Sequence, residues 1–229
     1  MAVFLAQTVP QLQSVVEMRD LTMQWGPRPV LDRVNLTLRA GERLAVVGPS
    51  GAGKSTVLRL LAGLQLPTSG ELSLFNQPQT YLRLDQNDPP DVRLVFQNPA
   101  LLASLTVEEN VGFLLRERAQ LSRQEIRDRV HACLEAVGLY DEPTAGLDPV
   151  ACTRIEDLIV KTTTVAQGCS VVVSHVRSTI ERSAQRVVML YGGRFQWEGS
   201  VDAFRSTDNP YVVQFRTGSL RGPMQPAEH

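Results

Sequence analysis

Two stretches in the first quarter of the chain alternate apolar and polar residues. They read VVEMRDLTMQW from Val15 and VLDRVNLTLRAGERLAVVG from Val30. Alternation with a period of two is typical of strands that bury one face, so both stretches predict strands of a small antiparallel sheet. The second stretch ends in the apolar run LAVV, which predicts a buried strand leading into the loop that follows.

The rest of the chain alternates helical and strand-like patterns, which indicates an α/β fold with a mostly parallel sheet flanked by helices. Two capping-box sequences, Thr106-x-x-Glu109 and Ser122-x-x-Glu125, mark helix starts. We predict one domain over residues 15–223, with a loose leader at 1–14, a helical insertion at about 98–137 and a tail at 224–229. The predicted elements after residue 48 are a helix at 55–64, strands at 71–75 and 91–96, helices within 106–137, a helix at 148–165, and strands at 170–174, 186–190 and 194–197.

The sequence GPSGAGKST at residues 48–56 matches the pattern G-x-x-x-x-G-K-[ST] and lies between a predicted strand and a predicted helix. Its glycines let the backbone turn N–H groups toward an anion, and the helix that follows adds the positive end of its dipole. Lys54 would reach the β- and γ-phosphates, and the Ser55 hydroxyl would bind Mg²⁺. The pattern predicts a nucleoside triphosphate site made by Gly48, Pro49, Ser50, Gly51, Ala52, Gly53, Lys54, Ser55 and Thr56.

Other candidate site residues follow predicted strands or turns. Gln97 and His175 each follow a strand, and a polar residue at the C-terminal end of a parallel strand can reach a ligand. A lone histidine is usually structural, but beside a phosphate loop we favour a γ-phosphate contact for His175. A short apolar run before Asp141 and Glu142 suits a strand that delivers Asp141 toward Mg²⁺ and Glu142 toward an attacking water. Trp25 either stacks on an adenine ring or is a half-buried turn residue, and its position does not separate the two.

Composition narrows the class of protein. Apolar residues make up 43% and charged residues 21%, which is ordinary for a soluble globular chain, and the net charge of −1 gives no case for a nucleic-acid partner. Cys133, Cys152 and Cys169 lack metal-ligand spacing and predict reduced thiols in a cytosolic protein. No apolar run approaches the roughly 20 residues that span a bilayer. The opening MAVFLAQTV has no basic residue, so a secretory signal is not predicted.

In their order along the chain, these motifs resemble those of the nucleotide-binding subunits of ABC transporters. GPSGAGKST resembles the Walker A loop, Gln97 the Q-loop glutamine, YDEP at 140–143 the end of Walker B, and AGLD at 145–148 the D-loop. His175 resembles the switch histidine and Trp25 the A-loop aromatic. The resemblance implies a P-loop nucleoside triphosphatase core with an N-terminal antiparallel β subdomain and a helical subdomain, which is shortened here.

Three segments are similar to the branch of this family that powers Mla/Mce-type lipid transport, including the chloroplast lipid importer. They are LTVEENVGFLLRE at 105–117, DEPTAGLDP at 141–149 and NPYVVQFRTGSLRGP at 209–223. The resemblance implies a subunit peripheral to the cytoplasmic face of the plasma (inner) membrane. Its implied partners are a membrane permease, a second ATP-binding subunit in a homo- or heterodimer, and a lipid-binding Mce-type subunit.

The resemblance also implies a role for each matched residue beyond the loop. Gln97 would hold Mg²⁺ together with the loop hydroxyl, and Asp141 would bind the metal through water. Glu142 would act as general base, and His175 would hold the γ-phosphate of ATP. Asp148 would cross the dimer interface.

One motif of the family is absent. Members carry an LSGGQ-like signature before Walker B, whereas no Ser-Gly-Gly occurs between Gln97 and Asp141. In the family the signature of one subunit closes the ATP site of the other, so a homodimer of this chain would have neither composite site complete. Residues 137–140 would have to serve as a central strand although Gly138 weakens a strand. A natural degenerate subunit, a shortened variant and an incomplete gene product all agree with this pattern.

Three functions follow from these observations. The first is an ATP-hydrolysing subunit that energises an ABC transporter, with phospholipid or a related lipid as cargo. The second, motivated by the absent signature, is a non-hydrolytic or degenerate regulatory subunit that only binds nucleotide. The third is an ABC-type ATPase without a permease, but such proteins usually carry two cassettes or large insertions, and neither occurs here.

Overall fold

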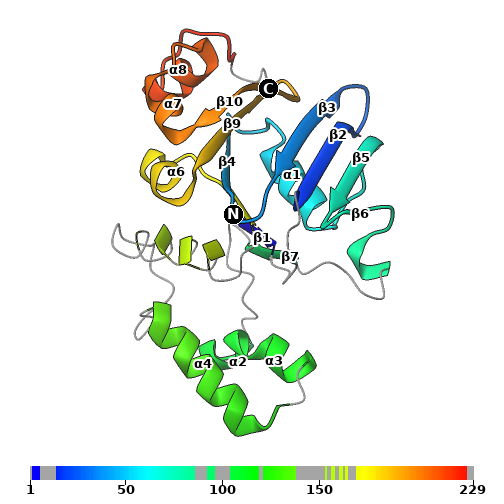
Figure 1. Cartoon of the computed structure of the whole chain (residues 1–229), viewed down its shortest axis with the longest axis vertical. Coiled ribbons are helices and arrows are strands. Elements are labelled where there is room, and N and C mark those ends of the chain that lie inside the picture. The colour runs from blue at the N-terminus through cyan, green and yellow to red at the C-terminus, as the bar shows by residue number, and fades with distance from the viewer. Residues whose placement is uncertain are drawn as a thin grey trace. The chain divides into compact units, whose positions relative to one another are not determined.

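The computed structural model divides into two compact units, Met1–Val95 with Ile159–His229, and Phe96–Leu158, each described by itself (Figure 1). It describes residues 2–5, 14–85, 92–95, 104–118, 121–137, 153, 156, 157, 160, 161, 163, 164 and 169–225. In this part of the chain, no helix combines the length and the apolar character that a bilayer crossing requires.

The first unit contains the predicted antiparallel sheet. Its strands lie in the order β3-β2-β5-β6, with bounds Pro29–Leu38, Val16–Gln24, Ser69–Leu74 and Gln77–Pro78. The alternation seen in the sequence becomes a buried face, because Val16, Met18, Leu36 and Leu38 are all almost fully buried. Strand β5 ends one residue earlier than predicted, because Phe75 adopts a left-handed backbone with φ of 51° and turns the chain.

The second sheet of this unit has the order β10-β9-β4-β8-β1-β7. The strands are β10 (Arg194–Ser200), β9 (Arg186–Tyr191), β4 (Arg43–Val47), β8 (Cys169–Val173), β1 (Ala2–Leu5) and β7 (Val92–Val95). Strand β4 is parallel to both β8 and β9, as the sequence predicts for the centre of the sheet. The other pairings among the described strands are antiparallel, so the sheet is mixed. The predicted α/β core with flanking helices is confirmed, with the parallel pairs made by β4.

Strand β1 lies inside the segment predicted as a loose leader. Ala2–Leu5 pairs along its whole length with β7 on one side and with β8 on the other. The pattern of the sequence could not show this, because AVFL is too short for a period and its partners are far along the chain.

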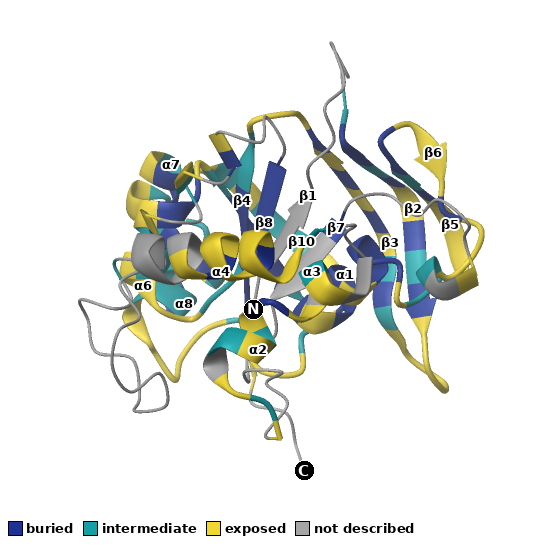
Figure 2. Ribbon diagram, turned by 90° about the horizontal axis from the view of Figure 1, so that it is seen from below, coloured by how far each residue is buried: buried dark blue, intermediate teal, exposed yellow. Residues whose placement is uncertain are grey.

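Helices cover both faces of the second sheet. On one face, α1 (Lys54–Leu61) and the antiparallel sheet share a core with Leu44 and Val46 of β4. On the other face, α6 (Arg177–Ser183), α7 (Val201–Ser206) and α8 (Pro210–Thr217) pack around Ala45, Val47 and Phe204. Strand β4 is therefore buried on both sides and is dark blue in Figure 2.

Helix α1 is shorter than the predicted 55–64. Ala62 is its C-cap, and the next residue, Gly63, has a φ of 68° that ends the helical path. A short 3-10 helix, η1 (Arg83–Asp85), follows the antiparallel sheet.

The second unit carries the predicted helices as α2 (Val107–Val111), α3 (Phe113–Arg118) and α4 (Arg123–Val137). Both capping boxes are confirmed: Glu109 N–H donates to the Thr106 hydroxyl at 3.2 Å, and Glu125 N–H donates to the Ser122 hydroxyl at 3.3 Å. Val137 closes α4, so it is not available for the strand considered at 137–140, whose other residues lie outside the described part. The residues described between 153 and 164 are helical, in agreement with the helix predicted at 148–165.

Candidate functional site: a phosphate loop between two sheets

The candidate site begins where β4 ends. Residues 48–53 lead from Val47 into α1, whose first residue is Lys54. The N-cap residue Gly53 has a φ of 98°, and no side chain caps the helix. The first N–H groups of a helix have no acceptor within it, so the amides of Lys54, Ser55 and Thr56 are oriented to bind an external acceptor. Together with the helix dipole, this uncapped end favours an anionic ligand.

Two positions of the loop, both glycines, lie so close to the two sheets that a side chain would not fit there. Gly48 has a φ of 149°, and a Cβ there would collide with the backbone carbonyl oxygen of Leu190 in β9. A Cβ on Gly53 would lie 3.0 Å from the carbonyl oxygen of Val30 in β3. The loop therefore packs against one strand of each sheet, which fixes the direction of its amides.

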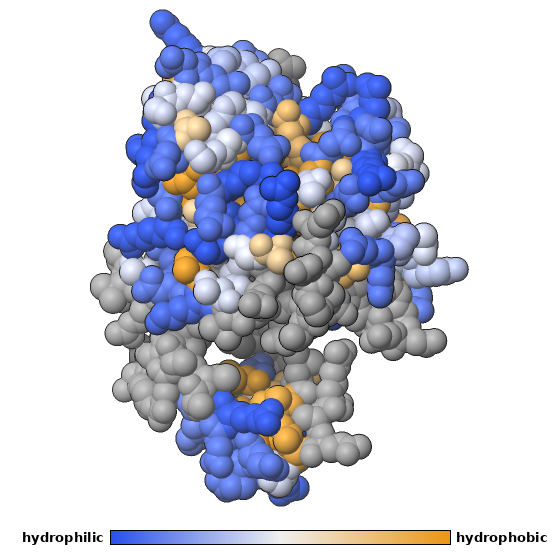
Figure 3. All heavy atoms as spheres, in the orientation of Figure 1, coloured by the Kyte–Doolittle hydropathy of each residue, from blue (hydrophilic) through white to orange (hydrophobic). Residues whose placement is uncertain are grey.

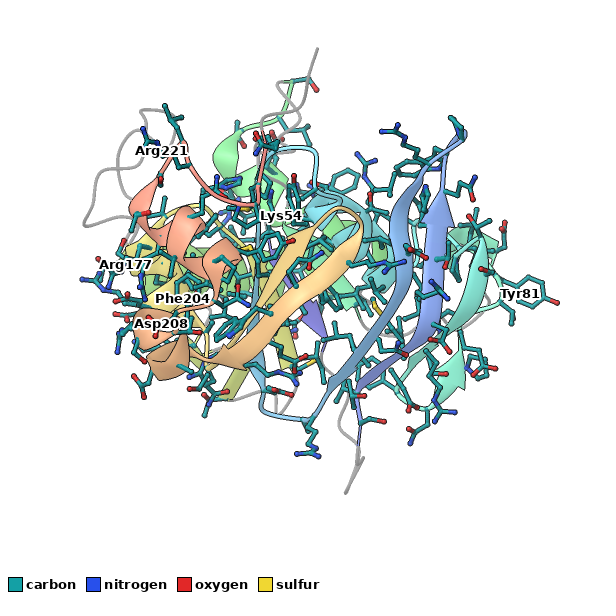
Figure 4. The ribbon with its side chains drawn as sticks, turned by 90° about the horizontal axis from the view of Figure 1, so that it is seen from above. Lys54, Tyr81, Arg177, Phe204, Asp208 and Arg221 are labelled. Atoms are coloured by element: carbon teal, nitrogen blue, oxygen red, sulfur yellow. The ribbon has the colours of Figure 1, made fainter. Side chains whose placement is uncertain are left out.

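Lys54 is 7% exposed, and Figure 4 labels it at the start of α1. Its Nζ donates hydrogen bonds to the carbonyl oxygens of Gly48 at 2.8 Å and Pro49 at 2.6 Å. Burial lowers the pKa of this amine from its ordinary value. Lys54 is thus a positive group held inside the loop, at the place where the sequence predicts phosphate contacts.

His175 lies two residues after β8 and is exposed. The protein still covers part of the imidazole, and this desolvation lowers its pKa; the positive charge of Lys54 lowers the pKa further. His175 therefore lies within electrostatic reach of the loop lysine, and its contact with the γ-phosphate stays a prediction. A lowered pKa keeps the ring neutral at pH 7, so that one ring nitrogen donates and the other accepts.

The titration of His175 gives the first testable expectation. Its pKa should lie below 6.5 and should rise in a Lys54→Ala variant, because the cationic neighbour is removed. Since the pKa in the folded state is lowered, the His175 contribution to stability is complete above pH 6.5 and is lost as pH falls through the folded-state pKa. NMR titration of the imidazole protons measures both effects, with His175→Gln to assign the signal. A pKa at or above 6.5 in the unmodified chain would contradict the placement.

An ion pair next to the loop was not predicted. Arg194 of β10 binds the Asp32 carboxylate of β3 through Nε at 2.8 Å and Nη2 at 2.5 Å. The backbone N–H of Asp32 also donates to the carbonyl oxygen of Gly193 at 2.8 Å. These bonds join the edge strands of the two sheets close to Val30, against which the loop packs. The sequence shows the Gly192-Gly193 turn, but no nearby sequence pattern predicts an ion pair between residues as far apart as Asp32 and Arg194.

The remaining predicted site residues are not brought together by the described structure. Gln97, Asp141, Glu142 and Asp148 lie outside the described residues, so their roles stay predictions. Trp25 follows β2 and is 50% exposed, and its stacking role also stays a prediction. Within the described ranges, no group of three or more His, Cys, Asp or Glu residues could hold a metal ion.

Comparison with known protein families shows the family to which the chain belongs. Residues 31–183 match the family described as ABC transporter, which is more than half of the chain and includes the phosphate loop and His175. The chain belongs to the ABC transporter family. Its solved relatives share the architecture described above: this ABC transporter chain superposes on "Dimeric Structure of MJ0796, a Bacterial ABC Transporter Cassette" with a TM-score of 0.68 and 25% identity, over 81% of this chain and 98% of that one.

Two curated relatives are similar over nearly the whole ABC transporter chain. Protein TRIGALACTOSYLDIACYLGLYCEROL 3, chloroplastic, of Arabidopsis thaliana is 36% identical over 261 aligned positions, covering 92% of this chain and 76% of that protein. Intermembrane phospholipid transport system ATP-binding protein MlaF of Haemophilus influenzae is 30% identical, covering 93% and 94%. The first alignment is longer than the 229 residues of this chain, so the relative has positions without a counterpart here.

Proposed function

We propose that this chain is the ATP-binding, ATP-hydrolysing subunit of an ABC transporter that moves phospholipid or a related lipid. The observation that carries the proposal is the uncapped N-terminus of α1, with Lys54 buried beside it and two glycines packed against both sheets. The names of both curated relatives support the lipid cargo, since one is part of a phospholipid transport system and the other is named after a galactolipid. These matches give no support to the alternative of a degenerate regulatory subunit.

The loop residues fit a nucleoside triphosphate with Mg²⁺. The amides after Gly53 and the ammonium of Lys54 would bind the β- and γ-phosphate oxygens, since they are the donors that a polyanion needs. The Ser55 hydroxyl is in the first turn of α1, next to Lys54, and would supply a Mg²⁺ ligand together with Gln97 and, through water, Asp141. A bound Mg²⁺ supplies charge neutralisation for the phosphate oxygens.

The remaining residues would act on the terminal phosphate. Glu142 would take a proton from the attacking water, and His175 would donate a hydrogen bond to a γ-phosphate oxygen. Trp25 would stack on the adenine ring, and Asp148 would cross the interface between two ATP-binding subunits. Lys54 would supply the positive charge, and His175 would supply a neutral imidazole. The neutral ring can donate a hydrogen bond to phosphate without placing a second cation beside the lysine.

The proposed partners are a membrane permease, a second ATP-binding subunit and a lipid-binding Mce-type subunit, at the cytoplasmic face of the plasma (inner) membrane. The second unit supports a permease contact, since Val111 and Phe113 are 40% and 41% exposed. Figure 3 shows apolar side chains gathered on this unit. Apolar side chains that gather in one contiguous exposed patch commonly mark an interaction surface. Dimerisation is supported by the solved relative MJ0796, a bacterial ABC transporter cassette whose structure is dimeric.

Steady-state ATP hydrolysis by the purified, folded chain tests the proposal. We expect turnover above that of a Glu142→Gln variant, because that substitution removes the proposed general base and leaves the loop intact. Both proteins should bind ATP with similar affinity. A difference in turnover then comes from the hydrolysis step and not from ATP binding. ATP binding without turnover above the variant would overturn the hydrolytic function and favour the regulatory alternative. Copurification with a membrane subunit then tests the permease contact.

A further inference from the structure

Strand β1 is the only described link between β7 and the rest of the second sheet. Ala2 pairs with Val95 of β7 and with Val172 of β8, and Leu5 pairs with Val92 and Cys169. Strand β7 stands at the end of the sheet order, and among the described strands it pairs only with β1. Without β1, the facing edges of β7 and β8 would be two strand spacings apart, about 10 Å, too far to hydrogen-bond. The order of the sheet at this place therefore depends on four residues.

The two strands that β1 joins both lead to the nucleotide edge. Strand β8 is parallel to β4, so the segment after Val173, which carries His175, leaves the sheet at the same edge as the phosphate loop. Strand β7 is antiparallel to β1, as β8 is, so β7 and β8 run in the same direction. Gln97, the predicted Mg²⁺ ligand, follows the end of β7 by two residues. Strand β1 thus sets the spacing between the ends of β7 and β8 at the sheet edge where the phosphate loop begins.

We propose that Ala2–Leu5 is a positioning strand. Both its insertion between β7 and β8 and the stability of the inserted strand are coupled to ATP binding. The coupling rests on the proposed function, whereas the insertion does not. Coupling between two equilibria is reciprocal, so ATP should hold β1 in the sheet, and an ordered β1 should favour ATP binding.

A native cysteine makes the insertion testable. Leu5 lies directly opposite Cys169, and opposite residues of antiparallel strands have Cα atoms about 4.5–5.5 Å apart and side chains on one face. This distance is suitable for a disulfide, so Leu5→Cys should form one with Cys169. Burial raises the pKa of Cys169 to about 12, so little thiolate is present in the folded chain. The bond should therefore be formed during refolding, with oxidised glutathione accepting the two electrons and two protons.

The matched control is Phe4→Cys. Residue 4 pairs with Ser170, and neighbouring residues of a strand point to opposite faces, so a thiol there cannot reach Cys169. In a background with Cys133→Ser and Cys152→Ser, mass spectrometry of peptides should find the bond in Leu5→Cys and not in Phe4→Cys. Absence of the bond in Leu5→Cys, or equal yield in both variants, would overturn the insertion.

Amide hydrogen exchange of the unmodified chain tests the coupling. Saturating ATP should slow exchange of residues 2–5 by about fivefold or more, and by more than it slows the β5–β6 hairpin at 69–78. Equal slowing of both segments would overturn the coupling, because it would report only general stabilisation. If the chain binds no ATP at all, the proposed function and the coupling both fail, while the disulfide yields still decide the insertion.

Discussion

Replacing Lys54 by alanine is expected to weaken ATP binding on the order of 100-fold or more. A buried ammonium that faces phosphate contributes roughly 2–5 kcal/mol, and each 1.4 kcal/mol is about tenfold in affinity. Lys54 is 7% exposed and is held by the carbonyl oxygens of Gly48 and Pro49, so little rearrangement is needed to present its charge. Isothermal titration with ATP and Mg²⁺ measures the change.

The sequence offers an unusually clean control for this variant. It contains two lysines, and the second, Lys161, is helical and exposed. Lys161→Ala removes the same charge from the same chain and should leave the affinity for ATP unchanged. Unaltered binding by Lys54→Ala, in a variant with an unchanged melting temperature, would refute the assignment of the loop.

Replacing Gly48 by alanine is expected to lower the free energy of unfolding by on the order of 3 kcal/mol. Two causes add together: a side chain disfavours the φ of 149° at this position, and its Cβ would collide with the Leu190 carbonyl oxygen. Because Leu190 is in β9, which pairs with β4, the clash cannot be relieved without displacing paired backbone. Urea unfolding measures the loss, and ATP affinity should fall with it, since the loop amides move.

Gly51 provides the comparison within the same loop. Its φ is 77°, but no atom lies within 4 Å of an added Cβ, so Gly51→Ala should cost only about 1 kcal/mol of backbone strain. A loss for Gly48→Ala no larger than that for Gly51→Ala would show that the contact with β9 does not constrain the loop.

The sequence predicted those parts of the molecule that carry a local signal. The phosphate loop needs glycines and a lysine at fixed spacing, and the capping boxes need only residues three apart, so both could be identified before any contact was known. Element ends were less predictable. Leu64 continues the apolar pattern of α1, but the left-handed backbone at Gly63 stops the helix before it.

Parts that depend on distant pairing were not predicted. The bond between Asp32 and Arg194 joins residues that are far apart in the sequence, and neither belongs to a motif. The same holds for β1, whose four apolar residues gain a structure only from the two strands on either side of them. The order of strands in a sheet is set by competition among all the strand edges that could pair. No single stretch of sequence contains the outcome of that competition.

The position of β1 also bears on how the chain can mature during synthesis. Strand β1 is made before β7, and β8 begins only at Cys169, so a ribosome must synthesise the chain through residue 173 before both neighbours of β1 exist. Closing contacts over such a span is slow, because the loop entropy is lost before any pairing offsets it. Nascent chains halted before residue 169 should therefore keep the central sheet open, with apolar strand edges exposed to chaperones.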